Sequence, residues 1–248
     1  MNLLFERTKN IRSILFDKDG TLINFNSIWI PLAFNLVENL LSEYGLGTRH
    51  KEILLGNIGL YSDGSVSPGS IYASGTGEDM ARAIYNYFIL YRKELPEFKI
   101  FLQEVIQKVK YYMVSNKSSI RIIGNAGETL AALRDKGFIL GLSTSDSEEN
   151  TLFCLKETGL LKYFDYIGCP DENRKPKPSG DILTDFCLNY GMSTNEVAVV
   201  GDTSTDITFA RINNAGLAIG VLSGAGDKKS LGAADIILKD VNQLAEVF

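Results

Sequence analysis

Short apolar runs that stop abruptly at polar residues recur along the chain. Apolar runs of this length, bounded by glycine and polar residues, are typical of strands buried on both faces. The first ends at Asp17, the second at Ser143 and the third at Gly201. We therefore predict strands at residues 14–16, 138–142, 197–200, 217–219 and 236–238.

Stretches with helical spacing lie between these runs. Asn125 and Glu128 have the spacing of a capping box, and Gly137 is placed to stop the helix that follows them. Residues 182–190 carry apolar side chains at helical intervals and end at Gly191. Strands that alternate with helices of this length predict an α/β fold, a doubly wound parallel sheet with helices on both faces.

The segment between the first strand and Asn125 has a different character. Residues 28–41 and 80–112 are long helix-compatible stretches, and they flank a segment rich in glycine and serine that contains the turn signal Asp63-Gly64. A mostly helical insertion explains this change. We predict an α/β core made of residues 1–23 and 118–248, and a mostly helical cap made of residues 24–117.

Polar residues follow the predicted strands, and in an open parallel sheet ligands bind beyond the carboxyl ends of the strands. Carboxylates, a hydroxyl group and a lysine at one edge suit a hard cation and a phosphoryl group. One carboxylate must be ionised to attack phosphorus, and another must handle the proton of the leaving oxygen. The residues in question are Asp17, Asp19, Ser143, Thr144, a lysine of the segment 174–178, Asp202 and Asp206.

These segments resemble, in order, the four motifs of the haloacid dehalogenase superfamily. Residues 17–22, Asp-Lys-Asp-Gly-Thr-Leu, resemble the first motif, and Thr144 after its strand resembles the second. Residues 175–178, Lys-Pro-Lys-Pro, resemble the third, and residues 201–206, Gly-Asp-Thr-Ser-Thr-Asp, resemble the fourth. A helical cap after the first motif is similar to the phosphoglycolate phosphatase-like branch of the superfamily.

The resemblance implies a Mg²⁺-dependent phosphatase that hydrolyses a small phosphate monoester, phosphoglycolate-like or a sugar phosphate, through an aspartyl-phosphate intermediate. It implies Asp17 as nucleophile, Asp19 as general acid and base, and Thr144 and Lys175 as phosphate contacts. Lys177 is the alternative to Lys175 as the phosphate-contacting lysine. The expected ligands of Mg²⁺ are Asp17, Asp19 (through its backbone carbonyl), Asp202 and Asp206, and the expected substrate or phosphate contacts are Gly20, Thr21, Ser145 and Asn26.

Position 18 is often apolar in that branch, whereas this chain has Lys18. We expect the side chain of Lys18 to point away from Asp17 and Asp19, with little effect on the mechanism. Two other functions share these features: a phosphomutase of the same fold, which also forms an aspartyl phosphate, and a non-catalytic phospho-acceptor or binding protein. The intact set of acids and the inserted cap count against the last.

Charge and cysteine content limit the classes of partner and the cellular location that we expect for the protein. The net charge is −5, and the chain has no basic run, which argues against a nucleic-acid groove or an anionic membrane surface. The three cysteines form no CxxC pair, and the first residues lack the apolar stretch of a signal peptide. We expect a cytoplasmic protein, a monomer or homodimer, whose partner is a small phosphorylated metabolite.

Overall fold

The structure, a computed structural model of the chain, describes residues 7–91 and 94–248. The chain divides into two compact units. The first comprises Met1–Asn24 and Arg121–Phe248, and the second comprises Phe25–Ile120. These junctions lie within three residues of the predicted ones.

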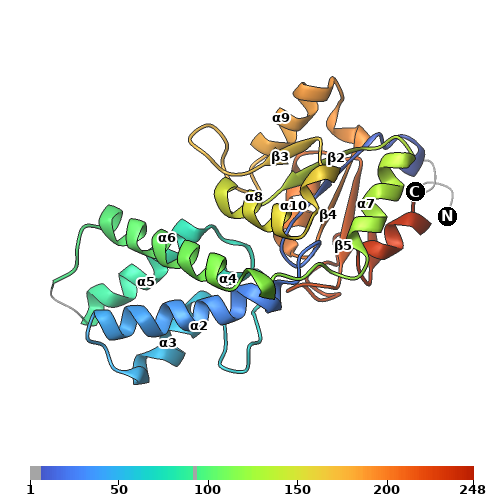
Figure 1. Cartoon of the computed structure of the whole chain (residues 1–248). Coiled ribbons are helices and arrows are strands. Elements are labelled where there is room, and N and C mark those ends of the chain that lie inside the picture. The colour runs from blue at the N-terminus through green and yellow to red at the C-terminus, as the bar shows by residue number, and fades with distance from the viewer. Residues whose placement is uncertain (1–6, 92–93) are drawn as a thin grey trace. The chain divides into compact units, whose positions relative to one another are not determined.

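The first unit contains a sheet of six parallel strands in the order β3-β2-β1-β4-β5-β6 (Figure 1). Its strands are β1 (Ser13–Phe16), β2 (Ile139–Ser143), β3 (Tyr166–Gly168), β4 (Val197–Gly201), β5 (Leu217–Val221) and β6 (Ile236–Leu238). The central strand β1 is fully buried, as expected for a strand covered on both faces. The predicted doubly wound parallel sheet is confirmed. Strand β3 was not predicted, because its residues Tyr166-Ile167-Gly168 include one aliphatic side chain and so form no apolar run.

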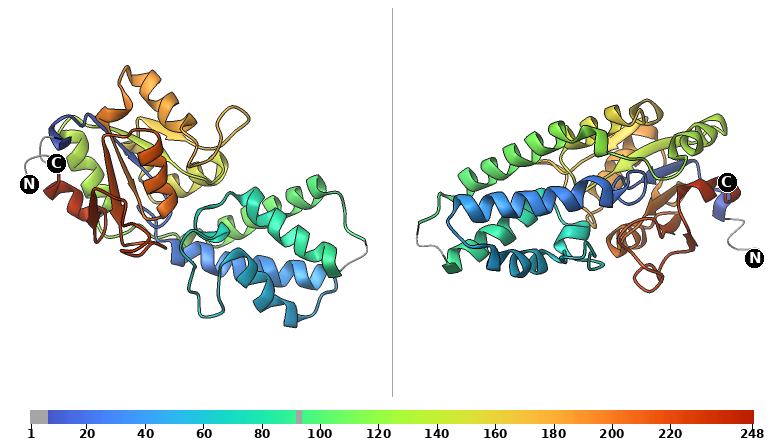
Figure 2. Two further views of the ribbon diagram at one scale, coloured as in Figure 1. Left: turned by 180° about the vertical axis from the view of Figure 1, so that it is seen from behind. Right: turned by 60° about the horizontal axis from the view of Figure 1, so that its bottom comes forward.

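Helices cover both faces of this sheet (Figure 2). They are α7 (Ala126–Asp135), α8 (Glu148–Glu157), α9 (Asp181–Tyr190) and α10 (Ser204–Ile212), with the 3₁₀ turns η3 (Leu161–Tyr163), η4 (Thr194–Glu196) and η5 (Val241–Glu246). On one face Phe186 of α9 and Phe209 of α10 pack in one cluster with Leu15 and Val199 of the sheet. Helices α7 and α8 cover the other face.

The predicted helix boundaries are borne out in part. Gly191 ends α9 with φ 59°, and Gly137 follows α7 with φ 89°, both in the left-handed region that glycine tolerates. The predicted capping box at α7 is not formed. The amide of Asn125 instead donates to Glu128 Oε2 at 3.0 Å, so the two side chains bond each other and leave the backbone N–H groups of the first turn uncapped by them.

The second unit is mostly helical (Figure 1). It contains α2 (Phe25–Glu43), η1 (Thr48–His50), α3 (Lys51–Ile58), α4 (Ile71–Ser74), α5 (Gly77–Tyr91), α6 (Phe98–Ser115) and η2 (Lys117–Ser119). Phe88 of α5 and Phe101 of α6 are fully buried and pack edge to face. The turn predicted at Asp63-Gly64 is present. Gly64 has φ 83°, and Leu60 and Val66 form an antiparallel bridge across the turn.

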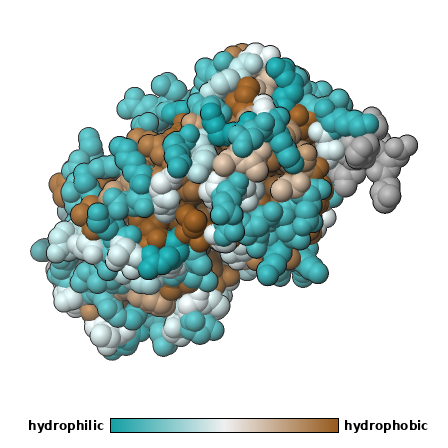
Figure 3. Space-filling model, turned by 45° about the vertical axis from the view of Figure 1, so that its right-hand side comes forward, coloured by the Kyte–Doolittle hydropathy of each residue, from teal (hydrophilic) through white to brown (hydrophobic). Residues whose placement is uncertain are grey.

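Hydrophilic and hydrophobic residues are interspersed on the face drawn in Figure 3. Within the two described ranges, no helix combines the length and apolar character needed to span a bilayer. Cys154, Cys169 and Cys187 are buried free thiols, so none of them forms a disulfide.

The register of the central strands brings the polar segments together. Phe16, the last residue of β1, lies opposite Leu142 of β2 and Val200 of β4. Asp17 and the residues that follow Leu142 and Val200 therefore leave the sheet at the same edge, as the fold class requires.

Candidate active site

Three buried carboxylates meet at the carboxyl edge of the sheet. Asp17 follows β1, Asp202 follows β4, and Asp206 lies in the first turn of α10. One carboxylate oxygen of each lies within 4.8 Å of the others. The structure thus brings together three of the four predicted metal ligands through their side chains. The fourth, Asp19, is predicted to bind through its backbone carbonyl, and its carboxylate contacts Lys18.

Asp202 is held by groups on two loops. The backbone N–H of Ala225 donates to its Oδ2 at 2.8 Å, and the hydroxyl of Thr21 lies 3.4 Å from its Oδ1. Gly20 and Gly224 press against the same carboxylate, because a Cβ at either position would lie within 2.4 Å of Asp202 Oδ2. Gly20 and Thr21, which are predicted to contact phosphate, therefore lie against the carboxylate of Asp202 and help to position it.

The lysine that contacts the acidic cluster is Lys177. Its ammonium donates to Asp17 Oδ1 at 2.7 Å and to Asp206 Oδ1 at 2.5 Å, and it is almost fully buried. Lys175, predicted as the phosphate-contacting lysine, is exposed. Its backbone N–H donates to Asp181 Oδ2 at 2.8 Å, which ties this residue to the first residue of α9. The structure therefore places Lys177, and not Lys175, in contact with the acids, and the phosphate-contacting role of either lysine stays a prediction.

Asp206 has two structural partners in addition to its place in the cluster. Thr203 is the N-cap of α10, and its N–H and hydroxyl donate to Asp206 Oδ2 at 3.0 and 2.6 Å. Since Lys177 engages Oδ1, both oxygens of Asp206 already accept hydrogen bonds. Asp206 therefore fixes the position of the lysine as well as adding charge to the cluster.

The cluster fits a hard divalent cation. Burial raises the pKa of Asp17 to about 7, against the opposing effect of Lys177. Burial, with the neighbouring carboxylates of Asp17 and Asp206, also raises the pKa of Asp202 well above its usual range. One lysine cannot neutralise three buried acids, and oxygen ligands crowded in this way suit Mg²⁺, which would favour their ionised forms.

The family follows from a comparison of the whole sequence with known proteins. The sequence model of the haloacid dehalogenase-like hydrolase family matches residues 11–213, which include all three acids and Lys177. The chain belongs to this family. The predicted relationship is thereby confirmed, and the hydrolase assignment with it.

Named relatives of this hydrolase include two kinds of phosphatase. A phosphoglycolate phosphatase from Chromobacterium violaceum is 26% identical over 240 residues, covering 97% of this chain and 96% of the relative. The pyrophosphatase PpaX from Bacillus pumilus is 25% identical and covers 79% of this chain and 77% of the relative. The crystal structure of a predicted phosphoglycolate phosphatase from Haemophilus somnus matches with a TM-score of 0.72 at 20% identity, covering 96% of this chain and 98% of that one, which supports the fold.

The other residues predicted to contact phosphate or substrate lie in different surroundings. Thr144 is buried directly after β2, and its Oγ1 accepts the backbone N–H of Asp146 at 3.2 Å. Ser145 follows it and is half-buried. Both lie at the edge of the sheet where Asp17 emerges. Asn26 lies at the start of α2 in the second unit and is exposed, so its predicted role as a substrate contact stays a prediction.

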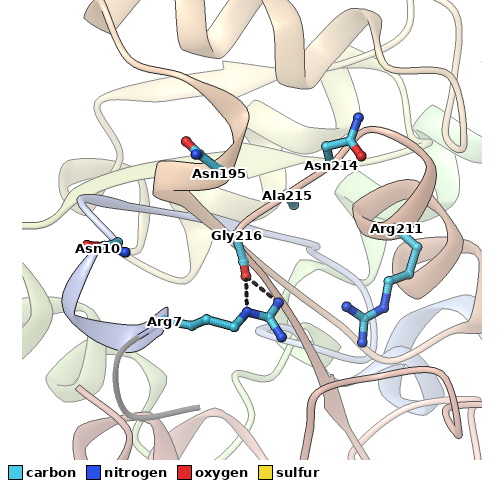
Figure 4. Close-up of a pocket in the computed structure, with 7 residues that line it drawn as sticks. All are labelled: Arg7, Asn10, Asn195, Arg211, Asn214, Ala215 and Gly216. Atoms are coloured by element: carbon cyan, nitrogen blue, oxygen red, sulfur yellow. Dashed lines mark hydrogen bonds between the residues drawn. The ribbon is translucent and has the colours of Figure 1, made fainter. Parts of the chain in front are cut away.

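A cavity of about 420 Å³ lies in the same unit but at the other end of the sheet (Figure 4). Arg7, Arg211, Asn195 and Gly216, which precedes β5, are among its lining residues. The guanidinium group of Arg7 donates to the carbonyl of Gly216, and both arginines pair with Asp235. These contacts tie Arg7 and α10 to the segments that precede β5 and β6, and none of the predicted catalytic residues lines this cavity.

Replacing Gly224 by alanine is expected to weaken Mg²⁺ binding by about tenfold or more, the usual cost of disturbing a group that orients a metal ligand. The new methyl group would overlap the carboxylate of Asp202, at 1.9 Å from Oδ2, and push it from the cluster. Calorimetric titration with Mg²⁺ measures the change. Gly77→Ala is the matched control, because its Cβ meets no described atom within 4 Å. Equal Mg²⁺ affinity in both variants would contradict the assignment of Asp202.

Proposed function

We propose that this hydrolase is a Mg²⁺-dependent phosphatase that hydrolyses a small phosphate monoester through an aspartyl phosphate on Asp17. One observation carries the proposal: Asp17 lies in a buried cluster with Asp202 and Asp206 and accepts a hydrogen bond from Lys177. A carboxylate, two further acids and an ammonium group are the parts that phosphoryl transfer to an aspartate requires.

The reaction has two steps. The ionised carboxylate of Asp17 attacks phosphorus, the bond from phosphorus to the ester oxygen breaks, and Asp19 gives its proton to the leaving alkoxide. Water then attacks the aspartyl phosphate, Asp19 takes the proton of that water, and the bond between phosphorus and Asp17 breaks to release inorganic phosphate. Lys177 and the hydroxyl of Thr144 supply donors for the phosphoryl oxygens during both steps.

The side chains of Asp17, Asp202 and Asp206 and the backbone carbonyl of Asp19 are the groups proposed to hold Mg²⁺. The bound cation supplies positive charge that reduces repulsion between the attacking carboxylate and the phosphate. The crowding of three acids, with the raised pKa values of Asp17 and Asp202, supports this requirement.

The substrate is proposed to be a small phosphorylated metabolite. Phosphoglycolate is the first candidate because the name of the relative from Chromobacterium violaceum specifies it, and pyrophosphate is the second because of PpaX. Sugar phosphates are further candidate substrates. We also propose a cytoplasmic enzyme, in keeping with three buried cysteines that form no disulfide.

A panel of phosphoglycolate, pyrophosphate and sugar phosphates tests the proposal. We expect inorganic phosphate to be released from at least one member with Mg²⁺, and a loss of about a hundredfold or more when the cation is chelated, since the acids then face the phosphate without it. Turnover without a sugar bisphosphate activator would distinguish hydrolysis from the phosphomutase reaction. Phosphate release that is unchanged by EDTA would refute the Mg²⁺ requirement.

A further inference from the structure

A second buried lysine lies beside the acidic cluster. The side chain of Lys18 is 0% exposed, and its ammonium lies 3.0 Å from Asp19 Oδ2 and 2.5 Å from Asp146 Oδ2. The expectation that Lys18 points away from both aspartates is therefore wrong for Asp19. Burying an ammonium group is costly unless carboxylates compensate it, so this arrangement depends on both acids.

Asp146 is anchored independently of the lysine. Its Oδ1 accepts the backbone N–H of Ser147 at 2.7 Å and the amide of Asn150 at 3.1 Å. Its own N–H donates to Thr144 Oγ1 at 3.2 Å. The carboxylate is therefore fixed at the start of α8, and it presents Oδ2 to Lys18 from the loop that carries Thr144.

Each aspartate of the first motif thus has its own buried lysine. Lys177 bonds Asp17 and holds it with Asp206, whereas Lys18 bonds Asp19 and holds it with Asp146. The two carboxylates are two residues apart in sequence, but each is paired with a different lysine. This separation matches the two chemical roles, since one carboxylate attacks phosphorus and the other exchanges a proton.

We propose that Lys18 is a positioning residue that orients the carboxyl group of Asp19 for proton transfer, with Asp146 as its fixed support. The proposal rests on the proposed function, because it assigns proton transfer to Asp19. An apolar residue at position 18 would fill the same buried space without directing Asp19 Oδ2. The contact also ties the loop that carries Asp17 to the loop that carries Thr144, and catalysis is sensitive to displacements of about 1 Å in such groups.

Lys18→Met tests this role through the leaving group of the substrate. For an alkyl phosphate, whose alkoxide must be protonated, we expect kcat/KM to fall by about a hundredfold, the lower end of what general acid catalysis contributes. For p-nitrophenyl phosphate, whose phenolate leaves without a proton, we expect a loss of less than about threefold. Equal losses on the two substrates would show that Lys18 acts on the structure of the whole site and would overturn the proposal.

A double-mutant cycle with Asp19→Asn gives the second test. If Lys18 acts through Asp19, adding Lys18→Met to Asp19→Asn should cause no further loss of kcat/KM, whereas additive losses would contradict the proposal. Lys18→Met/Asp146→Asn, which removes the buried ammonium together with the charge of its second carboxylate partner, replaces the single variant in both tests if that variant does not fold. Arg134→Met removes an ion pair with Asp165 at the other end of the sheet and should leave both substrates unaffected.

The cycle also separates this proposal from the proposed function. Full activity of Asp17→Asn would refute the function itself. Loss of activity in Asp17→Asn and Asp19→Asn, combined with additive effects of Lys18→Met, would refute only the positioning role of Lys18.

Discussion

Replacing Asp17 by asparagine is expected to lower kcat by about 10⁴-fold or more, in the range found when a covalent nucleophile is removed. The amide is a poor nucleophile and cannot form the aspartyl phosphate. The fold should persist, because asparagine fills the same buried space and removes a carboxylate whose ionisation burial opposes. We expect a melting temperature within a few degrees of that of the unmodified protein.

Two measurements check this prediction. Steady-state phosphate release gives the loss of kcat, and acid-quenched protein from a reaction with labelled substrate shows whether the chain carries phosphate. Beryllium fluoride with Mg²⁺ should inhibit the unmodified enzyme by mimicking the phosphorylated aspartate. Asp185→Asn is a matched control, because Asp185 accepts a hydrogen bond from Tyr166 away from the acidic cluster. Turnover above about one hundredth of the original in Asp17→Asn would exclude Asp17 as nucleophile.

The acids of the site were predictable because strand ends are local features. The run Ile14-Leu15-Phe16 stops at Asp17, and the run that ends at Val200 stops at Gly201-Asp202. Once the sheet is parallel, residues that follow neighbouring strands must meet at one edge. The convergence of Asp17 and Asp202 therefore follows from hydrophobic pattern and topology alone.

The choice between two lysines could not be made in the same way. Lys175 and Lys177 lie on a loop with two prolines, where neither strand nor helix periodicity fixes the direction of a side chain. In the structure the N–H of Ser179 donates to the carbonyl of Pro176 at 3.0 Å, which forms a turn with Lys177 at its second position. Turn geometry and the bond from Lys175 to Asp181 decide which lysine is buried.

The predicted direction of the Lys18 side chain was wrong for a related reason. Alternation along an extended strand places residues 17 and 19 on one side and residue 18 on the other, but the chain leaves the strand at Phe16. The carbonyl of Lys18 accepts the N–H groups of Leu22 and Ile23 at 2.9 Å, so the segment curls into a tight loop. In that loop a long side chain at position 18 reaches back to Asp19 and across to Asp146.

Lys177→Met and Lys175→Met form a matched pair, with the same substitution two positions apart. Loss of Lys177 is expected to lower kcat by about 10²- to 10³-fold, the cost of removing one donor to the charge of a transition state. It also leaves Asp17 and Asp206 without the ammonium group that holds them together. Lys175→Met should stay within about twofold of the unmodified enzyme, because surface substitutions away from such contacts have small effects.

The pair is measured by kcat and KM on the best substrate of the phosphate panel, with the melting temperature of each variant as a check on folding. Removal of a buried cation between two carboxylates can destabilise the fold, so Lys177→Gln, which keeps a hydrogen-bond donor, is measured beside Lys177→Met. A large loss in Lys175→Met with a small loss in Lys177→Met would restore the original prediction of Lys175. A loss confined to Lys177→Met would instead identify Lys177 as the phosphate-contacting lysine. Because the Lys-Pro-Lys-Pro segment offers the same side chain at both positions, the turn at Pro176 would then account for the choice between them.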